Sequence, residues 1–166
     1  AAKEGKITTK SAGDHIEENI ELAPTPAWFG FSLDGRFGRL SYLWAGSTAL
    51  LLLSLGTSIG LKTTNFGLIT FFIIVTVLIS LRYTALRCHD TGWSGWLSLV
   101  VFIPYLGSLF SLILLILPGD KRDNQFGPPP VQAGRNAAII GLIALLVSGA
   151  LWTSNMKEAM RLAGKY

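Results

Sequence analysis

The chain alternates between long apolar stretches and short polar segments. Four stretches are mainly apolar, and they cover residues 42–61, 67–86, 94–117 and 136–153. Each reaches or approaches the roughly 20 residues that a helix needs to cross a hydrocarbon core about 30 Å thick. The pattern predicts an all-α integral membrane protein that folds as a compact bundle of about four hydrophobic helices.

The third apolar stretch carries two residues that weaken a straight helix, Pro104 and Gly107, near its centre. It is therefore expected to be Pro/Gly-kinked or re-entrant. A re-entrant hairpin of two half-helices is tolerated when its turn is buried in protein or lines a wet cavity. Pro kinks are common in membrane helices, which favours the kinked crossing, although the residues alone leave both alternatives open.

Composition agrees with a membrane protein, since 50% of the residues are hydrophobic and 14% are charged, against roughly 25% charged in soluble domains. The net charge of +4 could indicate nucleic-acid binding, but cations beside membrane spans usually reflect topology. We therefore expect no nucleic-acid partner.

The cations are unevenly distributed about the predicted spans. With four crossings, ten lie on one side: Lys3, Lys6, Lys10, Arg36, Arg39, Arg82, Arg87, Lys157, Arg161 and Lys165. The other side has Lys62, Lys121, Arg122 and Arg135. The positive-inside rule then places both termini in the cytoplasm. A re-entrant third stretch moves the tail to the opposite side and again gives ten cations against four, so the N-terminus is predicted to be cytoplasmic in either case.

Three segments of the chain differ in character. Residues 1–30 are polar, and Asp14 followed by Glu17 predicts a capped short helix over residues 15–22 that could dock on a partner. Residues 31–130 form the predicted membrane domain with its polar motifs. Residues 131–166 add a further transmembrane helix and a basic tail.

Small residues mark one face of two apolar stretches. Gly56 and Gly60 form a GxxxG motif in the first stretch. Those of the fourth are Ala137, Gly141, Ala144 and Ser148, spaced three or four residues apart. Because such faces let helix backbones approach closely, we expect helix packing there, and internal packing is favoured over packing on another protein.

Polar residues gather in three clusters beside the membrane, at residues 34–39, 87–96 and 118–130. Together they resemble the small bacterial inner-membrane family catalogued as domain of unknown function 805. The shared motifs are Gly-Arg-x-Gly-Arg, Arg-x-His-Asp-x-Gly-x-Ser-Gly-Trp, Ile-Pro-x-x-Gly, Pro-Gly and Asn-x-aromatic-Gly-Pro. The matching positions are Gly35, Arg36, Gly38, Arg39, Tyr42, Arg87, His89, Asp90, Gly92, Ser94, Gly95, Trp96, Pro104, Gly107, Pro118, Gly119, Asn124, Phe126, Gly127 and Pro128.

The resemblance covers about residues 31–130 and implies a multi-pass protein of the bacterial inner membrane, with no established activity. The chain departs from the family at Leu86 and Gln125, where members often carry Arg, and at Pro129, where an acid is common. These departures remove cations that an arginine-dependent anion site would use.

His89 and Asp90 are the strongest candidates for chemistry, since an imidazole can act as a general acid or base near neutral pH. However, adjacent helix residues point about 100° apart, so Asp90 need not orient His89. The sequence also lacks a nucleophile paired with a base, a phosphate-binding glycine loop and a zinc ligand set. We therefore expect no catalytic residues, no enzyme activity, no cofactor and no metal.

The candidate polar cluster consists of Arg36, Arg39, Arg87, His89 and Asp90. One interpretation is that hydrogen bonds and ion pairs among Arg87, His89 and Asp90 fix a tight linker. The other is that the arginines and His89 hold anionic lipid headgroups or an acidic partner segment. The chain is expected to be an accessory or assembly subunit that binds a larger membrane protein complex. A small transporter or channel, and an anionic-lipid-binding protein, are the alternatives.

Overall fold

The computed structural model describes residues 32–131 and 133–164. In chain order the elements are α1 (Arg39–Lys62), α2 (Phe66–Asp90), the 3₁₀ helix η1 (Gly95–Phe102), α3 (Leu106–Ile116) and α4 (Arg135–Ala163). An isolated antiparallel bridge joins Asn124 and Gly127, and the described residues form no β-strand. The prediction of an all-α bundle is confirmed. The short helix expected over residues 15–22 lies outside the described residues.

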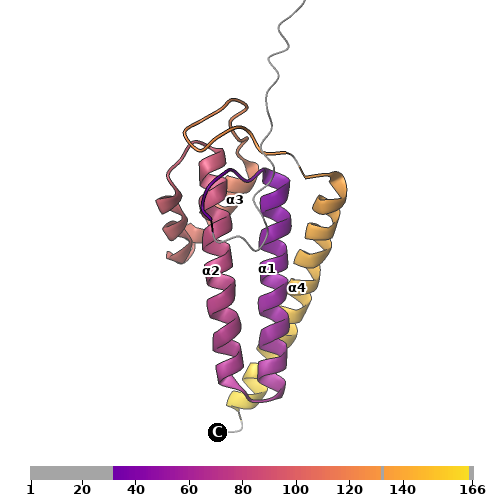
Figure 1. Ribbon diagram of the computed structural model, residues 1–166. Coiled ribbons are helices and arrows are strands. Elements are labelled where there is room, and N and C mark those ends of the chain that lie inside the picture. The colour runs from indigo at the N-terminus through magenta and orange to yellow at the C-terminus, as the bar shows by residue number, and fades with distance from the viewer. Residues whose placement is uncertain (1–31, 132, 165–166) are drawn as a thin grey trace, which may run out of the picture.

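Three helices are long and apolar enough to cross a membrane, namely α1, α2 and α4, with 24, 25 and 29 residues. They run alongside one another in Figure 1. The start of α1, the end of α2 and the start of α4 lie together at what we call the motif end. The opposite end, where α1 passes into α2 and where α4 finishes, is the tail end (Figure 1).

The third apolar stretch forms a hairpin instead of a span. Its two halves, η1 with 8 residues and α3 with 11, are each too short to cross a bilayer. Both ends of the hairpin lie at the motif end (Figure 1), where the backbone N–H of Asp120 donates to the carbonyl oxygen of Asp90 at 2.8 Å. The re-entrant alternative is therefore the one that the structure shows, and the kinked crossing is not.

Backbone conformation at the hairpin turn explains why the helix does not continue through it. Tyr105 has a positive φ of 63°, which a right-handed helix cannot include, and it follows Pro104. Gly107 then lies directly against the backbone of Val101, and a side chain at this position would collide with the carbonyl of that residue. The glycine thus permits α3 to pack back against η1.

Three spans place the two described ends of the chain on opposite sides of the bundle. Figure 1 shows α1 beginning at the motif end and α4 finishing at the tail end. The expectation that both termini share one side followed from four crossings, and it does not hold for three. Of the ten described cations, seven are at the motif end and three, Lys62, Lys157 and Arg161, are at the tail end.

The small residues predicted to mark packing faces lie at helix contacts within the chain. A side chain at Gly56 would collide with the ring of Phe72, and one at Gly60 with Ile69, both on α2. On α4, a Cβ on Gly141 would lie 3.1 Å from the Cα of Trp44 in α1. The same α4 face carries the buried Ala144 and Ser148 and the half-buried Ala137. Helix α1 is therefore packed between α2 and α4.

A polar contact joins α1 to α4 inside the bundle. The Oγ of Ser58 donates to Oδ1 of Asn155 at 2.7 Å, and Nδ2 of Asn155 donates to the carbonyl oxygen of Ser54 at 3.0 Å. Ser54 in turn donates from Oγ to the carbonyl oxygen of Ser148 at 3.3 Å. These bonds satisfy a buried amide that would otherwise be costly in an apolar interior.

Candidate functional site

At the motif end, a buried carboxylate lies between two buried guanidinium groups. Oδ1 of Asp90 is 3.1 Å from Nη2 of Arg36, and Oδ2 accepts a hydrogen bond from Nη1 of Arg87. The arginine side chains are 0% exposed and the aspartate side chain is 3% exposed. Arg87 and Asp90 are three residues apart in the last turn of α2, which puts them on one helix face. Burial of these charges is tolerable because they are paired and hydrogen-bonded.

The remaining donors of Arg36 hold the loop that follows α3. Nη1 donates to the carbonyl oxygens of Arg122 at 2.8 Å and Gly127 at 3.1 Å, while Nη2 donates to the carbonyl oxygen of Asp120. Nε bonds to Oδ1 of Asp90 at 3.2 Å. Arg36 precedes α1 in the chain, so one side chain ties the approach to α1, the end of α2 and the loop after α3 together.

Arg87 uses its other donors on the C-terminal end of α3. Nε donates to the carbonyl oxygen of Leu114 at 2.9 Å, and Nη2 donates to that of Leu117. The last carbonyls of a helix lack partners within the helix and carry partial negative charge, so a cation is favourable there. Arg87 therefore caps α3 and fixes the hairpin against α2.

Two glycines allow the chain to pass close to this ion group. A side chain at Gly119 would collide with the carboxylate of Asp90. Gly92 has a φ of 75° just after α2, a conformation that glycine adopts without strain. Its N–H donates to the carbonyl oxygen of His89 at 3.1 Å, which completes the helix end.

His89 is adjacent to the ion group but is not paired with Asp90. Its ring stacks on Phe126 with centroids 3.8 Å apart, and Nδ1 lies 3.4 Å from the carbonyl oxygen of Gly35. Asn124 donates from Nδ2 to the carbonyl oxygen of His89 at 2.9 Å and accepts from the N–H of Phe126. The imidazole is therefore packed between three segments of the chain.

The structure brings four of the five predicted cluster residues together and leaves one apart. Arg36, Arg87 and Asp90 form the buried ion group, and His89 lies beside it. Arg39, the first residue of α1, is exposed and has no hydrogen bond or ion pair within the described residues. Because Arg36 and Arg87 direct their donors at Asp90 and at backbone carbonyls, they are not available to lipid headgroups. This geometry supports the interpretation in which the cluster fixes the linker.

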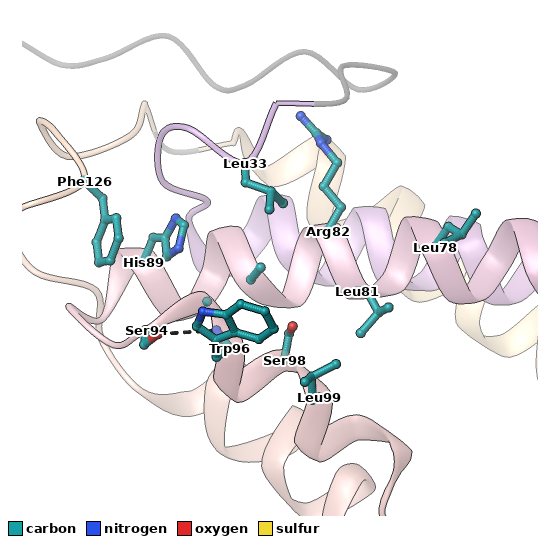
Figure 2. A pocket seen from close by; sticks show the side chains of 12 residues that line it. Leu33, Leu78, Leu81, Arg82, His89, Ser94, Trp96, Ser98, Leu99 and Phe126 are labelled. Atoms are coloured by element: carbon teal, nitrogen blue, oxygen red, sulfur yellow. Dashed lines mark hydrogen bonds between the residues drawn. The ribbon is translucent and has the colours of Figure 1, made fainter.

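An open groove of about 660 Å³ lies beside this cluster, between α2 and η1 (Figure 2). Its lining residues are Leu33, Leu78, Leu81, Arg82, Ala85, His89, Ser94, Gly95, Trp96, Ser98, Leu99 and Phe126. The sequence did not reveal the groove, because it exists only when the hairpin returns to the motif end. The one sequence feature that could have indicated it is Arg82, a cation within an otherwise apolar stretch.

The described part of the chain has no evident metal site. Among residues 32–131 and 133–164, no group of three or more His, Cys, Asp or Glu side chains could hold a metal ion. Cys88, the single cysteine of the chain, is buried and free.

Comparison with known proteins gives a family and two relatives. The chain is 32% identical over 71 residues to the inner membrane protein YhaH of Escherichia coli, a match that covers 43% of this chain and 54% of YhaH. It is also 32% identical over 59 residues to the inner membrane protein YhaI of Escherichia coli, covering 36% of this chain and 50% of YhaI. The chain thus spans about half the length of these relatives.

No solved structure matches the chain. The family described as "Protein of unknown function (DUF805)" matches residues 30–128, which is more than half of the 166 residues. This range contains the ion group, the hairpin and all of the groove lining. The chain belongs to the DUF805 family.

Proposed function

We propose that this chain is a non-enzymatic protein of the bacterial inner membrane that acts as an accessory or assembly subunit of a larger membrane protein complex. The location rests on the three candidate spans and on the inner membrane relatives. The binding role rests on one observation, the exposed turn of the re-entrant hairpin.

The turn of the hairpin consists of residues 102–106, and all five are exposed. Tyr105 is 92% exposed, and Phe102 is 55% exposed. Helix η1 at about 2.0 Å per residue and α3 at about 1.5 Å per residue each extend about 16 Å. A hairpin of that length reaches about half-way through a hydrocarbon core of about 30 Å.

Irregular backbone at that depth is expected to be covered, although the N–H groups of Ile103 and Leu106 bond within the hairpin. Re-entrant turns occur where they are buried in protein or line a water-filled cavity, since lipid cannot satisfy free backbone polar groups. In this chain the turn is exposed. A second membrane protein that covers residues 102–106 meets this requirement, and exposed aromatic rings such as Tyr105 are typical anchors of protein interfaces.

The buried ion group supports the same proposal. Arg36, Arg87 and Asp90 satisfy one another and the backbone, so the most polar part of the family motif serves to hold the hairpin in place. We therefore propose that the ion group holds the hairpin rigidly, so that the hairpin turn can bind a neighbouring membrane protein.

The proposed orientation of the protein in the membrane rests on the distribution of its cations. Seven of the ten described cations lie at the motif end, and cations near spans favour the cytoplasmic side. We accordingly propose that the motif end, with the approach to α1, faces the cytoplasm.

Cross-linking in the native membrane tests the binding role. A photo-cross-linking phenylalanine analogue replaces Tyr105 in one variant and Phe66 in a matched control, since Phe66 is 71% exposed at the tail end. The proposal expects one protein adduct from position 105, identified by mass spectrometry, and none of the same identity from position 66. Adducts with lipid alone at position 105 would overturn it.

Mild-detergent extraction then tests stability of the complex. The cross-linked partner should co-purify in stoichiometric amount with the full chain. A parallel deletion of residues 1–30 asks whether that segment contributes to docking. Loss of the partner with the deletion would assign part of the interface to residues 1–30, whereas retention would assign it to the hairpin.

Two further functions were expected as alternatives. Transport stays a prediction, for which flux through liposomes is the test. Lipid binding has a specific observation in its favour, the groove beside Arg82.

A further inference from the structure

The groove between α2 and η1 has apolar walls and a polar rim. Leu78, Leu81 and Ala85 line it from α2, and Leu99 lines it from η1 (Figure 2). Its volume of about 660 Å³ lies within the range of about 300–1,000 Å³ that is usual for small-molecule sites. The groove is open along one side and is bordered by Trp96, which is exposed.

Arg82 supplies the only cation among the residues that line this groove. Its Nε donates to the carbonyl oxygen of Ser32 at 3.0 Å, which fixes the guanidinium against the segment that precedes α1. Its Nη1 is buried and has no hydrogen-bond partner within the described residues. The guanidinium carbon lies 5.9 Å from the ring centre of Tyr83, and no described carboxylate forms an ion pair with Arg82.

An unsatisfied donor on a cation is unusual, because arginine side chains in membrane segments normally reach a carboxylate, a carbonyl or the headgroup layer. Arg82 differs in this respect from Arg36 and Arg87, whose donors are used inside the protein. A planar guanidinium binds phosphate oxygens through its N–H donors, so a phosphate in the groove is a suitable partner for Arg82, whose donors are not all used inside the described residues.

The position of Arg82 along α2 is also compatible with a phosphate ligand. Arg82 is eight residues before the end of α2 at Asp90, which corresponds to about 12 Å along the helix axis. In Figure 2 the Arg82 side chain extends from α2 on the side of Leu33, away from Ser98 and Leu99 of η1. Hydroxyl groups of Ser94 and Ser98 lie along the opposite wall. Leu78 and Leu81 come before Arg82 in α2 and so lie farther from the motif end.

We propose that this groove binds one anionic phospholipid, with an acyl chain between α2 and η1 and the phosphate on Arg82. The site is separate from the hairpin turn on which the accessory role rests, so each proposal can fail without the other. It shares His89 with the lipid site expected from the sequence but differs in its cation, because it uses Arg82 and none of Arg36, Arg39 and Arg87.

Lipid retention measured by native mass spectrometry tests this site. The full chain is prepared in nanodiscs that contain equal amounts of phosphatidylglycerol and phosphatidylethanolamine, and the bound lipid is counted after release. The variants are Arg82→Gln, which removes the cation, and Leu81→Trp, which fills the groove and keeps the cation. Arg39→Gln is the matched control, since it removes an exposed cation at the same end outside the groove.

The proposal expects the wild-type chain to retain phosphatidylglycerol preferentially. Arg82→Gln should reduce that retention about fivefold, as expected for the loss of one cation at an anionic membrane surface, while Arg39→Gln retains it. Leu81→Trp should reduce retention of both lipids. A matching melting temperature in the same nanodiscs shows that each variant is folded.

Two results would overturn the proposal. Equal retention by Arg82→Gln and Arg39→Gln would mean that bulk charge, and not the groove, selects the lipid. A rise in retention when residues 1–30 are deleted, with no effect of Arg82→Gln, would mean that the groove is the docking place of the chain's own N-terminal segment.

Discussion

Arg87 donates from Nε to the carbonyl oxygen of Leu114 at 2.9 Å, so that a side chain of α2 closes the end of α3. The same guanidinium is paired with Asp90, one helical turn later. Arg87 therefore links the carboxylate of Asp90 to α3, the helix along which the chain returns to the motif end. These residues of the family motif thus hold the re-entrant hairpin in place.

Replacement of Arg87 by Lys should destabilise the fold although the charge is kept. Lysine lacks the planar fork that reaches Leu114, Leu117 and Asp90 at once. Breaking a buried pair on one side costs about 3–5 kcal/mol, and Lys should lose a large part of that. The free energy of unfolding in mixed micelles is the measurement. Arg39→Lys, at the exposed start of α1, is the control and should leave it unchanged.

Gly119→Ala should also destabilise the protein, because the added methyl group meets the carboxylate of Asp90. Overpacking of a well-packed site typically costs about 1–3 kcal/mol. Gly149→Ala is the matched control, since nothing lies within 4 Å of a Cβ at that position of α4. This second change should stabilise the helix by up to about 1 kcal/mol. Equal melting temperatures for the two variants would contradict the close approach of the loop to Asp90.

The Ser58–Asn155 hydrogen bond of 2.7 Å should contribute measurably to the packing of α1 on α4. Polar contacts between membrane helices average about 0.6 kcal/mol and reach about 1.7 kcal/mol. A double-mutant cycle with Ser58→Ala and Asn155→Ala isolates the pair, and the coupling energy should fall in that range. Strictly additive effects of the two changes would show that the bond does not hold the helices together.

Much of the helical framework could be predicted from the sequence. Long apolar runs indicate the three spans, and the spacing of Gly141, Ala144 and Ser148 indicates the face of α4 that meets α1. Arg36, Arg87 and Asp90 were identified as one cluster from their motifs, and they are joined in the structure. These features depend on local pattern, which a sequence carries directly.

The path of the third stretch could not be predicted in the same way. A kinked crossing and a hairpin give the same cation count of ten against four, so charge does not separate them. The decision depends on contacts between distant residues, such as the bond between Asp120 and Asp90. The groove beside Arg82 depends on that decision and could not be found before it. The contact of Asn155 with α1 was not predicted, because a polar residue near the basic tail is typical of a helix end.

Topology provides a direct check of the hairpin. In a Cys88→Ala background, single cysteines at Ser32, Asp123 and Gly164, all exposed, are labelled in spheroplasts with a membrane-impermeant maleimide. Three spans with a cytoplasmic motif end predict that Gly164→Cys reacts at once, while Ser32→Cys and Asp123→Cys react only after permeabilisation.

The other labelling patterns separate the fold from its orientation. Four crossings would place residue 123 outside and residue 164 inside, with residue 32 still inside, and this pattern would contradict the hairpin. Residues 32 and 123 reacting together outside, with residue 164 protected, would keep the hairpin but reverse the proposed orientation. Because α2 ends and α4 begins at the same end of the bundle, residues 32 and 123 must behave alike if the fold holds in the membrane.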